Sequence, residues 1–159
     1  MDKNEHIYAI FGASGDLTKR KLVPAIYSLF IQKLLPKKFI LLGLSRTNYS
    51  DEQFRDKMKS AISEFDESED TSMMDEFINH IYYLSFDSEK SEDYGILKEK
   101  LKQLRDEKEI NGNTVFYLST PPELYSVIPK YLAKVNLNDQ SDGWKRIIIE
   151  KPFGTDLES

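Results

Sequence analysis

The chain contains no cysteine, which excludes a disulfide framework and a thiolate metal site. Its apolar runs all fall short of the ~18 residues that a membrane helix requires. Its first residues also lack the long apolar segment and cleavage site of a signal peptide. We therefore expect a soluble protein of the reducing cytoplasm, without a membrane partner.

A basic surface is also missing from the middle of the chain. The formal net charge is −5, and residues 51–110 hold 18 of the 27 acidic residues but only 9 of the 22 basic ones. A nucleic-acid backbone requires a basic face, so this distribution argues against a nucleic-acid partner. The basic excess elsewhere includes Lys19, Arg20, Lys21 and Arg46, and a few such charges are enough for a small phosphorylated ligand.

Hydrophobic residues make up 40% of the 159 residues and aromatic ones 12%, which supplies enough apolar surface for a core. The length is that of one domain. Apolar runs of strand length alternate with segments whose apolar residues recur at helical spacing. The expected strands span residues 6–11, 39–44, 81–86, 114–119 and 146–150. The expected helices span residues 17–34, 51–65, 73–80, 91–108 and 121–135.

Local signals sharpen three of these helices. Ser50 followed three residues later by Gln53 is a capping-box pattern, which predicts a helix that begins after Ser50. Pro24 is tolerated only near the start of the first helix. The first and fourth helices should each bury one apolar face. These faces comprise Leu22, Ala25, Ile26, Leu29 and Phe30 in the first helix, and Leu97, Leu101 and Leu104 in the fourth.

Short apolar strands that alternate with helices indicate a parallel sheet covered on both faces. Right-handed crossovers then give an α/β, doubly wound Rossmann domain with a mainly parallel sheet. We expect this domain to span residues 1–159. In such a sheet the carboxyl ends of the strands share one edge, and ligands bind there.

A glycine-rich turn, Gly-Ala-Ser-Gly-Asp-Leu, lies between the first strand and the first helix. Gly12 and Gly15 would let the backbone approach a pyrophosphate, and the helix that follows supplies free N–H groups. The spacing is not that of the G-x-G-x-x-G fingerprint, so the position after a strand and before a helix carries the prediction. The alternative is a tight turn without a ligand. The chain has no Walker A string, which argues against ATP hydrolysis.

Arg46 follows the second strand, where NAD-binding Rossmann domains usually carry an acidic residue for the ribose hydroxyls. A carboxylate would repel a 2′-phosphate, whereas an arginine can pair with it. Arg46 therefore predicts NADP rather than NAD. Taken alone, it could equally be an ordinary solvated arginine.

The fifth strand closes on Glu150, Lys151 and Pro152. Lys151 could offer a cation to a phosphate or a donor to a sugar hydroxyl, although a solvated lysine after a strand is the simpler interpretation. Tyr125 lies at helical spacing and is typical of a packing residue. His6 and His80 have no spaced partner, and neither a Ser/His/Asp set nor a metal-ligand cluster is present.

Four segments resemble the glucose-6-phosphate dehydrogenase family in order and spacing. They read GASGDLTKRKLVPA from Gly12, LGLSR from Leu42, FYLSTPP from Phe116 and IEKPFG from Ile149. The resemblance implies oxidation of glucose 6-phosphate to 6-phosphogluconolactone with hydride transfer to NADP, in the pentose phosphate pathway.

The resemblance also implies roles for individual residues. Arg46 would bind the adenosine 2′-phosphate, Tyr125 and Lys151 would lie along the cofactor, and Lys151 would also reach the sugar phosphate. Thr18 stands where the family often has alanine, and its hydroxyl could crowd the helix start or add a hydrogen bond. The residues that would wrap the pyrophosphate are Gly12, Ala13, Ser14, Gly15, Asp16, Leu17, Thr18 and Lys19.

The family's catalytic histidine segment and its large α+β substrate domain lie downstream of the last residue of this chain. We therefore expect no catalytic residue in the chain, binding of NADP and NADPH without turnover, and homo-oligomers only with the further domain. Two other interpretations stay open. One is an oxidoreductase of the glucose–fructose oxidoreductase type, and the other is a non-catalytic domain that senses NADP.

Overall fold

Five parallel strands form the centre of the computed structural model, which describes residues 4–150. Their spatial order is β3-β2-β1-β4-β5, and every neighbouring pair is parallel. The order reverses between β1 and β4, which makes their carboxyl ends the switch point where ligands bind in such sheets. The strands are β1 (His6–Phe11), β2 (Phe39–Ser45), β3 (Ile81–Ser85), β4 (Thr114–Leu118) and β5 (Lys145–Ile149). The predicted doubly wound α/β fold is confirmed.

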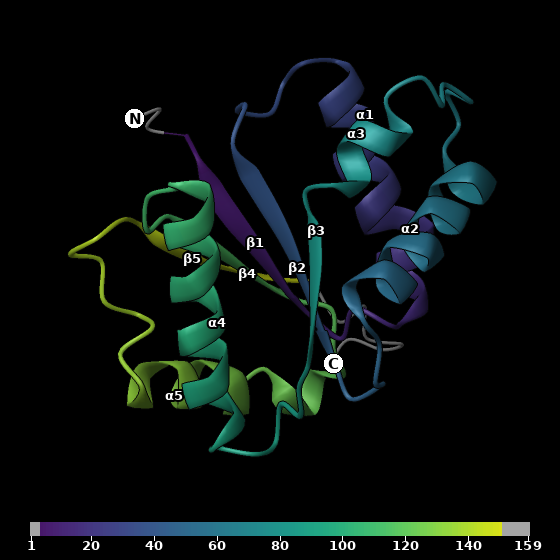
Figure 1. The fold of residues 1–159 in the computed structure, drawn as a ribbon. Helices are drawn as coiled ribbons and strands as arrows, with labels where there is room; N and C mark the ends of the chain where they lie inside the picture. The colour runs from purple at the N-terminus through teal and green to yellow at the C-terminus, as the bar shows by residue number, and fades with distance from the viewer. Residues whose placement is uncertain (1–3, 151–159) are drawn as a thin grey trace, which may run out of the picture.

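Helices cover both faces of the sheet. In Figure 1, α1, α2 and α3 lie on one side of the strands, and α4 and α5 lie on the other. The helices are α1 (Val23–Ile31), α2 (Asp51–Phe65), α3 (Met74–Ile78), α4 (Asp93–Lys108) and α5 (Val127–Lys134). Among the residues that the structure describes, no helix has the length and apolar character needed to cross a membrane.

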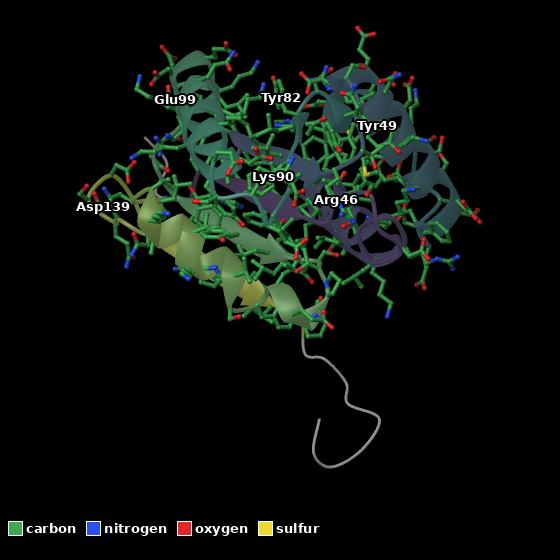
Figure 2. All side chains as sticks on the ribbon, turned by 90° about the horizontal axis from the view of Figure 1, so that it is seen from below. Arg46, Tyr49, Tyr82, Lys90, Glu99 and Asp139 are labelled. Carbon is green, nitrogen blue, oxygen red and sulfur yellow. The ribbon has the colours of Figure 1, made fainter. Side chains whose placement is uncertain are left out.

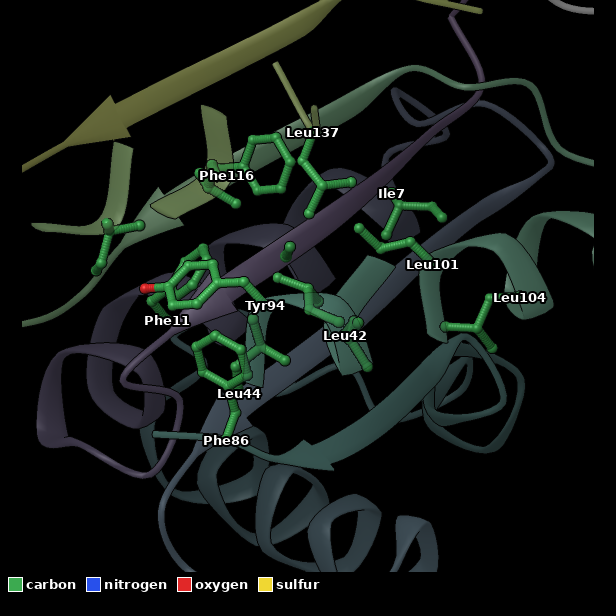
Figure 3. Packing of buried hydrophobic residues seen from close by; sticks show 14 of the residues in the cluster. Ile7, Phe11, Leu42, Leu44, Phe86, Tyr94, Leu101, Leu104, Phe116 and Leu137 are labelled. Atoms are coloured by element: carbon green, nitrogen blue, oxygen red, sulfur yellow. The ribbon is translucent and has the colours of Figure 1, made fainter. Parts of the chain in front are cut away.

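Each face of the sheet has its own hydrophobic cluster. On the α4 side, Phe11, Phe86 and Tyr94 are in ring contact, with centroids 4.9–6.4 Å apart. Figure 3 shows these rings together with leucines of α4 and the strands. The predicted face of α4, Leu97, Leu101 and Leu104, is fully buried here. Each such side chain contributes about 1.5–3 kcal/mol of burial free energy, so this cluster stabilises the packing of α4 on the sheet.

The capping-box prediction for α2 is confirmed in full. Ser50 Oγ accepts from the Gln53 N–H at 3.1 Å, and the Ser50 N–H donates to Gln53 Oε1 at 2.9 Å. The reciprocal pair satisfies two groups that would otherwise lack partners at the helix start. It fixes the entry into α2 directly after the β2 end that carries Arg46.

The first helix differs from the prediction in its start and in its buried face. A π-helical turn over Thr18–Leu22 precedes α1, and the Val23 N–H bonds to the Thr18 carbonyl. Pro24 has no N–H and its ring would clash with a carbonyl four residues earlier, so a widened turn relieves the conflict. The wider turn rotates the helix. Val23, Pro24, Ile26 and Tyr27 are buried, whereas Ala25 and Leu29 are exposed.

The last helix is shorter than predicted. A 3₁₀ turn over Pro122–Leu124 is followed by a break, and α5 begins only at Val127. Pro129 explains the break, because a proline is accommodated in the first turn of a helix but not in its interior. A helix that began at Pro122 would place Pro129 in its interior.

The amino ends of the strands meet at the opposite edge from the switch point, and their polar groups are engaged with one another. Lys145 Nζ donates to Asp142 Oδ1 at 2.7 Å and to the Gly112 carbonyl at 2.8 Å. Arg105 donates to the other oxygen of Asp142 at 2.8 Å. We call Arg105, Gly112, Asp142 and Lys145 the amino-end cluster. It ties the end of α4 to the starts of β4 and β5.

Candidate functional site

A cleft of about 660 Å³ lies at the carboxyl ends of β1 to β4. It opens where the strand order reverses, the position that doubly wound sheets use for ligands. Its lining combines the glycine-rich turn, the turn after β2 and the loops after β3 and β4. The lining residues are Gly12, Ser14, Gly15, Ser45, Arg46, Thr47, Phe86, Asp87, Ser88, Glu89, Ser119, Thr120, Pro121, Glu123 and Leu124.

Gly12 anchors the floor of this cleft. Its φ is +80°, and a Cβ there would lie 2.0 Å from the Ser119 carbonyl oxygen. The Gly12 and Ala13 N–H groups both donate to the Leu44 carbonyl, at 2.9 and 3.0 Å. The turn is therefore held between the ends of β2 and β4, and only glycine meets both the conformation and the space.

Gly15 differs from Gly12. It is exposed, its φ lies outside the left-handed region, and a Cβ would approach only the Gly12 carbonyl, at 3.3 Å. Gly15 and Ser14 both line the cleft. A helix begins at Asp16, and its first N–H groups lack acceptors within the helix. This part of the turn can therefore face an anion.

The remaining predicted pyrophosphate residues lie behind or beside the cleft lining. Ala13 and Thr18 are fully buried. The Thr18 hydroxyl donates to Ser119 Oγ at 3.4 Å, so it adds a hydrogen bond where crowding was the alternative. Asp16 and Leu17 do not line the cleft, and Lys19 lines a separate hollow against α2.

Arg46 lines the cleft from the end of β2, and its side chain is exposed. Figure 2, which views the molecule from below, shows it near the middle of this end, between the helices of the two faces. Within residues 4–150 its guanidinium has no hydrogen bond or ion pair. Asp51, the first acidic residue after β2, is already engaged, because its Oδ1 accepts from the Tyr83 N–H at 2.7 Å.

A further part of the cleft lining was not indicated by the sequence pattern. It consists of Asp87, Ser88 and Glu89 after β3, together with Thr120 and Glu123 after β4. The Glu89 N–H donates to Asp87 Oδ1 at 2.9 Å, and Tyr94 Oη donates to the Ser88 carbonyl at 2.8 Å, so the loop is ordered from within. The only sequence signal was position, since these residues directly follow two strands.

Tyr125 does not line the cleft. Its hydroxyl donates to the Glu150 carbonyl at 2.9 Å, and the Tyr117 hydroxyl bonds to the Glu150 side chain. Both tyrosines therefore hold the residue that follows β5. Lys151, predicted to contact cofactor and substrate, and Pro152 lie outside the described residues.

Both histidines lie at the far edge of the sheet from the cleft. His6 opens β1 and bonds through Nδ1 to the Asn4 carbonyl, and His80 precedes β3 and bonds through Nδ1 to the Phe39 carbonyl. Burial lowers the pKa of each ring below its usual value. Among residues 4–150, no group of three His, Cys, Asp or Glu residues is placed to hold a metal ion.

Comparison with known proteins gives a consistent result. Residues 9–159 match the family model "Glucose-6-phosphate dehydrogenase, NAD binding domain". The glucose-6-phosphate 1-dehydrogenase of Aggregatibacter actinomycetemcomitans is 45% identical over 150 residues, which cover 94% of this chain and 30% of that protein. The corresponding protein of Treponema pallidum is 42% identical over 156 residues, or 97% of this chain and 30% of the relative.

Solved structures agree with the sequence relatives. A glucose-6-phosphate dehydrogenase in complex with its substrate glucose-6-phosphate superposes with a TM-score of 0.81 and 33% identity, covering 99% of this chain and 32% of that one. The enzyme from Mycobacterium avium gives a TM-score of 0.77 and 29% identity, covering 96% and 31%. The chain thus spans about 30% of the length of the curated relatives it matches.

Proposed function

Because the chain belongs to the glucose-6-phosphate dehydrogenase family through its NAD binding domain, we propose that residues 1–159 bind a nicotinamide dinucleotide with a preference for NADP. The main support is the position of Arg46. It follows β2, lines the cleft at the switch point of the sheet and has no partner among the described residues. When bound, the nicotinamide ring accepts a hydride from a substrate.

The cleft fits a pyrophosphate at the glycine-rich turn. Gly12 keeps that turn pressed against Ser119, so the backbone of Ser14 and Gly15 forms the wall of the cleft without a bulky side chain in front of it. The helix start at Asp16 adds N–H donors and the positive end of a dipole. These groups bind and orient the phosphates.

Arg46 supports the choice of NADP over NAD. A 2′-phosphate beside β2 would meet a guanidinium that has no partner among residues 4–150, and the nearest following acid, Asp51, is held by the Tyr83 N–H. The cleft also presents carboxylates of Asp87, Glu89 and Glu123, from the loops after β3 and β4. Carboxylates accept from hydroxyls and amino groups rather than from phosphates, so they suit other parts of the ligand.

We propose further that this domain serves the oxidation of glucose 6-phosphate to 6-phosphogluconolactone, in the cytoplasmic pentose phosphate pathway, with Lys151 as a contact to the sugar phosphate. Hydride transfer from C1 needs a base within hydrogen-bond reach of the hydroxyl proton. His6 and His80 lie at the other edge of the sheet, which supports binding of the dinucleotide by this chain without turnover.

Calorimetric titration of the purified chain with NADP and with NAD tests the preference. A charge-assisted pair at the 2′-phosphate is worth roughly 1.5–3 kcal/mol, so NADP should bind about tenfold to a hundredfold more tightly. Equal affinities, or no heat with either dinucleotide, would contradict the proposal. In a parallel absorbance assay, NADP with glucose 6-phosphate should yield no NADPH.

A further inference from the structure

We infer that Tyr83 is a positioning residue for Arg46 and thereby a determinant of the preference for NADP. This inference rests on the proposed role of Arg46 at the 2′-phosphate. Tyr83 lies in β3, one strand away from Arg46, and is only 5% exposed. It contacts the segment between β2 and α2 through both its hydroxyl and its backbone.

The hydroxyl of Tyr83 binds both sides of Arg46 in the chain. It lies 2.5 Å from Ser45 Oγ, 3.0 Å from the Ser45 carbonyl and 2.5 Å from the Thr47 carbonyl. One phenolic proton serves the carbonyls, so the serine hydroxyl donates in return. The residues before and after Arg46 are thus fixed to one buried oxygen.

The backbone and ring of Tyr83 extend the same constraint to α2. β3 is one of the two outer strands of the sheet, and its Tyr83 N–H faces away from β2 and donates to Asp51 Oδ1 at 2.7 Å. The ring packs against Tyr49 and Phe54, with centroids 5.3 and 4.8 Å apart. Residues 45–51 are therefore held at both ends of the turn that carries Arg46.

Ser85 adds a second contact from the same face of β3. Its hydroxyl donates to the Thr47 carbonyl at 3.2 Å, the same oxygen that Tyr83 contacts. Arg46 itself is exposed, and the described part of the chain provides no side chain that bonds to its guanidinium. The direction of Arg46 thus depends on its backbone, which Tyr83 and Ser85 hold.

This geometry predicts that Tyr83 affects the affinity for NADP but not the affinity for NAD. Without its hydroxyl, Arg46 samples more orientations and loses part of its contact with a 2′-phosphate. NAD carries only a hydroxyl at that position and no phosphate for Arg46 to pair with, so its affinity is not altered. The loss of one such constraint corresponds to a decrease of about threefold to tenfold in NADP affinity.

The test compares NADP and NAD affinities by calorimetry in the full 159-residue chain. Tyr83→Phe should weaken NADP about threefold to tenfold and leave NAD unchanged. In an Arg46→Ala background the same substitution should have no further effect on either dinucleotide. Tyr27→Phe is the matched control, because it removes another buried tyrosine hydroxyl, bonded to the Asp70 carbonyl at 2.6 Å and remote from the cleft.

Three results would overturn the inference. One is an unchanged NADP affinity in Tyr83→Phe, and another is an equal loss for NADP and NAD, which indicates a general structural role. The third is an Arg46→Ala variant that binds NADP normally. That result would overturn the proposed function as well, and the Arg46→Ala variant alone therefore separates a failure of the proposed function from a failure of the inference about Tyr83. If Tyr83→Phe does not fold, Ser85→Ala decides, with a smaller loss of NADP affinity expected and no change for NAD.

Discussion

The two edges of the sheet use the same residue types in opposite ways. At the amino ends, Arg105 and Lys145 are both bonded to Asp142, and both side chains are largely buried. At the carboxyl ends, Arg46 is exposed and lines a cleft. Arginine and lysine stabilise the fold where their charges are compensated within it, and they are available to a ligand where they are not.

Glycine, in contrast, has the same role at both ends of the strands. Gly12 lies at the carboxyl ends of the strands, where the cleft opens, yet a Cβ there would overlap the Ser119 carbonyl, so its role is to allow β1 and β4 to close the cleft floor. Gly112 lies at the amino edge, and a Cβ there would lie 2.5 Å from the Asp142 carbonyl oxygen. Both edges therefore depend on a glycine for close packing, and only the charged residues distinguish them.

Gly12→Ala should have the largest effect. Steric overlap with the Ser119 carbonyl and a φ of +80° together predict a loss of about 3 kcal/mol or more in the free energy of unfolding. Chemical denaturation followed by circular dichroism measures it. Gly95→Ala is the control, since nothing lies within 4 Å of a Cβ at this helical position and a gain of about 0.5–1 kcal/mol is expected. A fully stable Gly12→Ala variant would show that the turn can move away from β4.

Arg46→Ala and Arg105→Ala test the contrast between the edges directly. Arg46→Ala should cost about 1.5–3 kcal/mol of NADP binding, or about tenfold to a hundredfold, with no change in unfolding free energy. Arg105→Ala should reduce stability by about 1 kcal/mol and leave NADP affinity unchanged, because its partner Asp142 belongs to the amino-end cluster. Calorimetry measures the NADP affinity of both variants, and chemical denaturation measures the unfolding free energy of both. A loss of NADP affinity in Arg105→Ala would remove the distinction.

Lys145→Met should destabilise the chain by about 1–2 kcal/mol, because the methionine keeps the apolar stem but loses the bonds to Asp142, Gly112 and Gly143. Its NADP affinity should equal that of the parent chain. Thermal unfolding, with and without NADP, measures both quantities. If the midpoint temperature is unchanged, the amino-end cluster does not contribute to stability.

The smallest effect concerns the two histidines of the amino edge. Burial lowers the pKa of His6 and His80, so the unfolded chain binds more protons than the folded one at mildly acidic pH. The contribution of the two neutral histidines to the free energy of unfolding should therefore be complete above the ordinary histidine pKa of about 6.5. It should decrease as the pH falls below that value toward the folded-state pKa. Urea denaturation between pH 8 and 5 measures this slope. The double variant His6→Gln, His80→Gln should lose the part of the slope that lies near pH 6, and an unchanged slope would assign it to other groups.

The fold was predictable because its signals are local. The capping box at Ser50, the apolar strand runs and the leucines of α4 depend on neighbours within a few residues, and they appear as predicted. The site was predictable only in part. Arg46 and the glycine-rich turn follow strand ends, so their place at the cleft could be derived from a parallel sheet.

The rest of the site depends on contacts between distant segments. Ser119 fills the space at Gly12, and Tyr83 holds the segment around Arg46, but neither pairing leaves a trace in the sequence pattern. The prolines show a related limit. Pro24 and Pro129 can be read from the sequence, but their effects cannot. The widened turn before Pro24 and the late start of α5 before Pro129 both depend on how each helix packs on the sheet.

The strand order also determines when the cleft can be completed during synthesis. β1 pairs with β2 within the first part of the chain, but its other neighbour is β4, so Ile7 has no partner on that side until Thr114 has been made. Pairings of such long sequence separation form slowly, because a long loop must close first. The part of the sheet formed by β1, β2 and β3, which contains Tyr83 and leads into Arg46, can therefore assemble early. The contact between Gly12 and Ser119 can form only after β4 has been made. A nascent chain would acquire the residues proposed to recognise the 2′-phosphate before it acquires Ser119, which holds the glycine-rich turn in place.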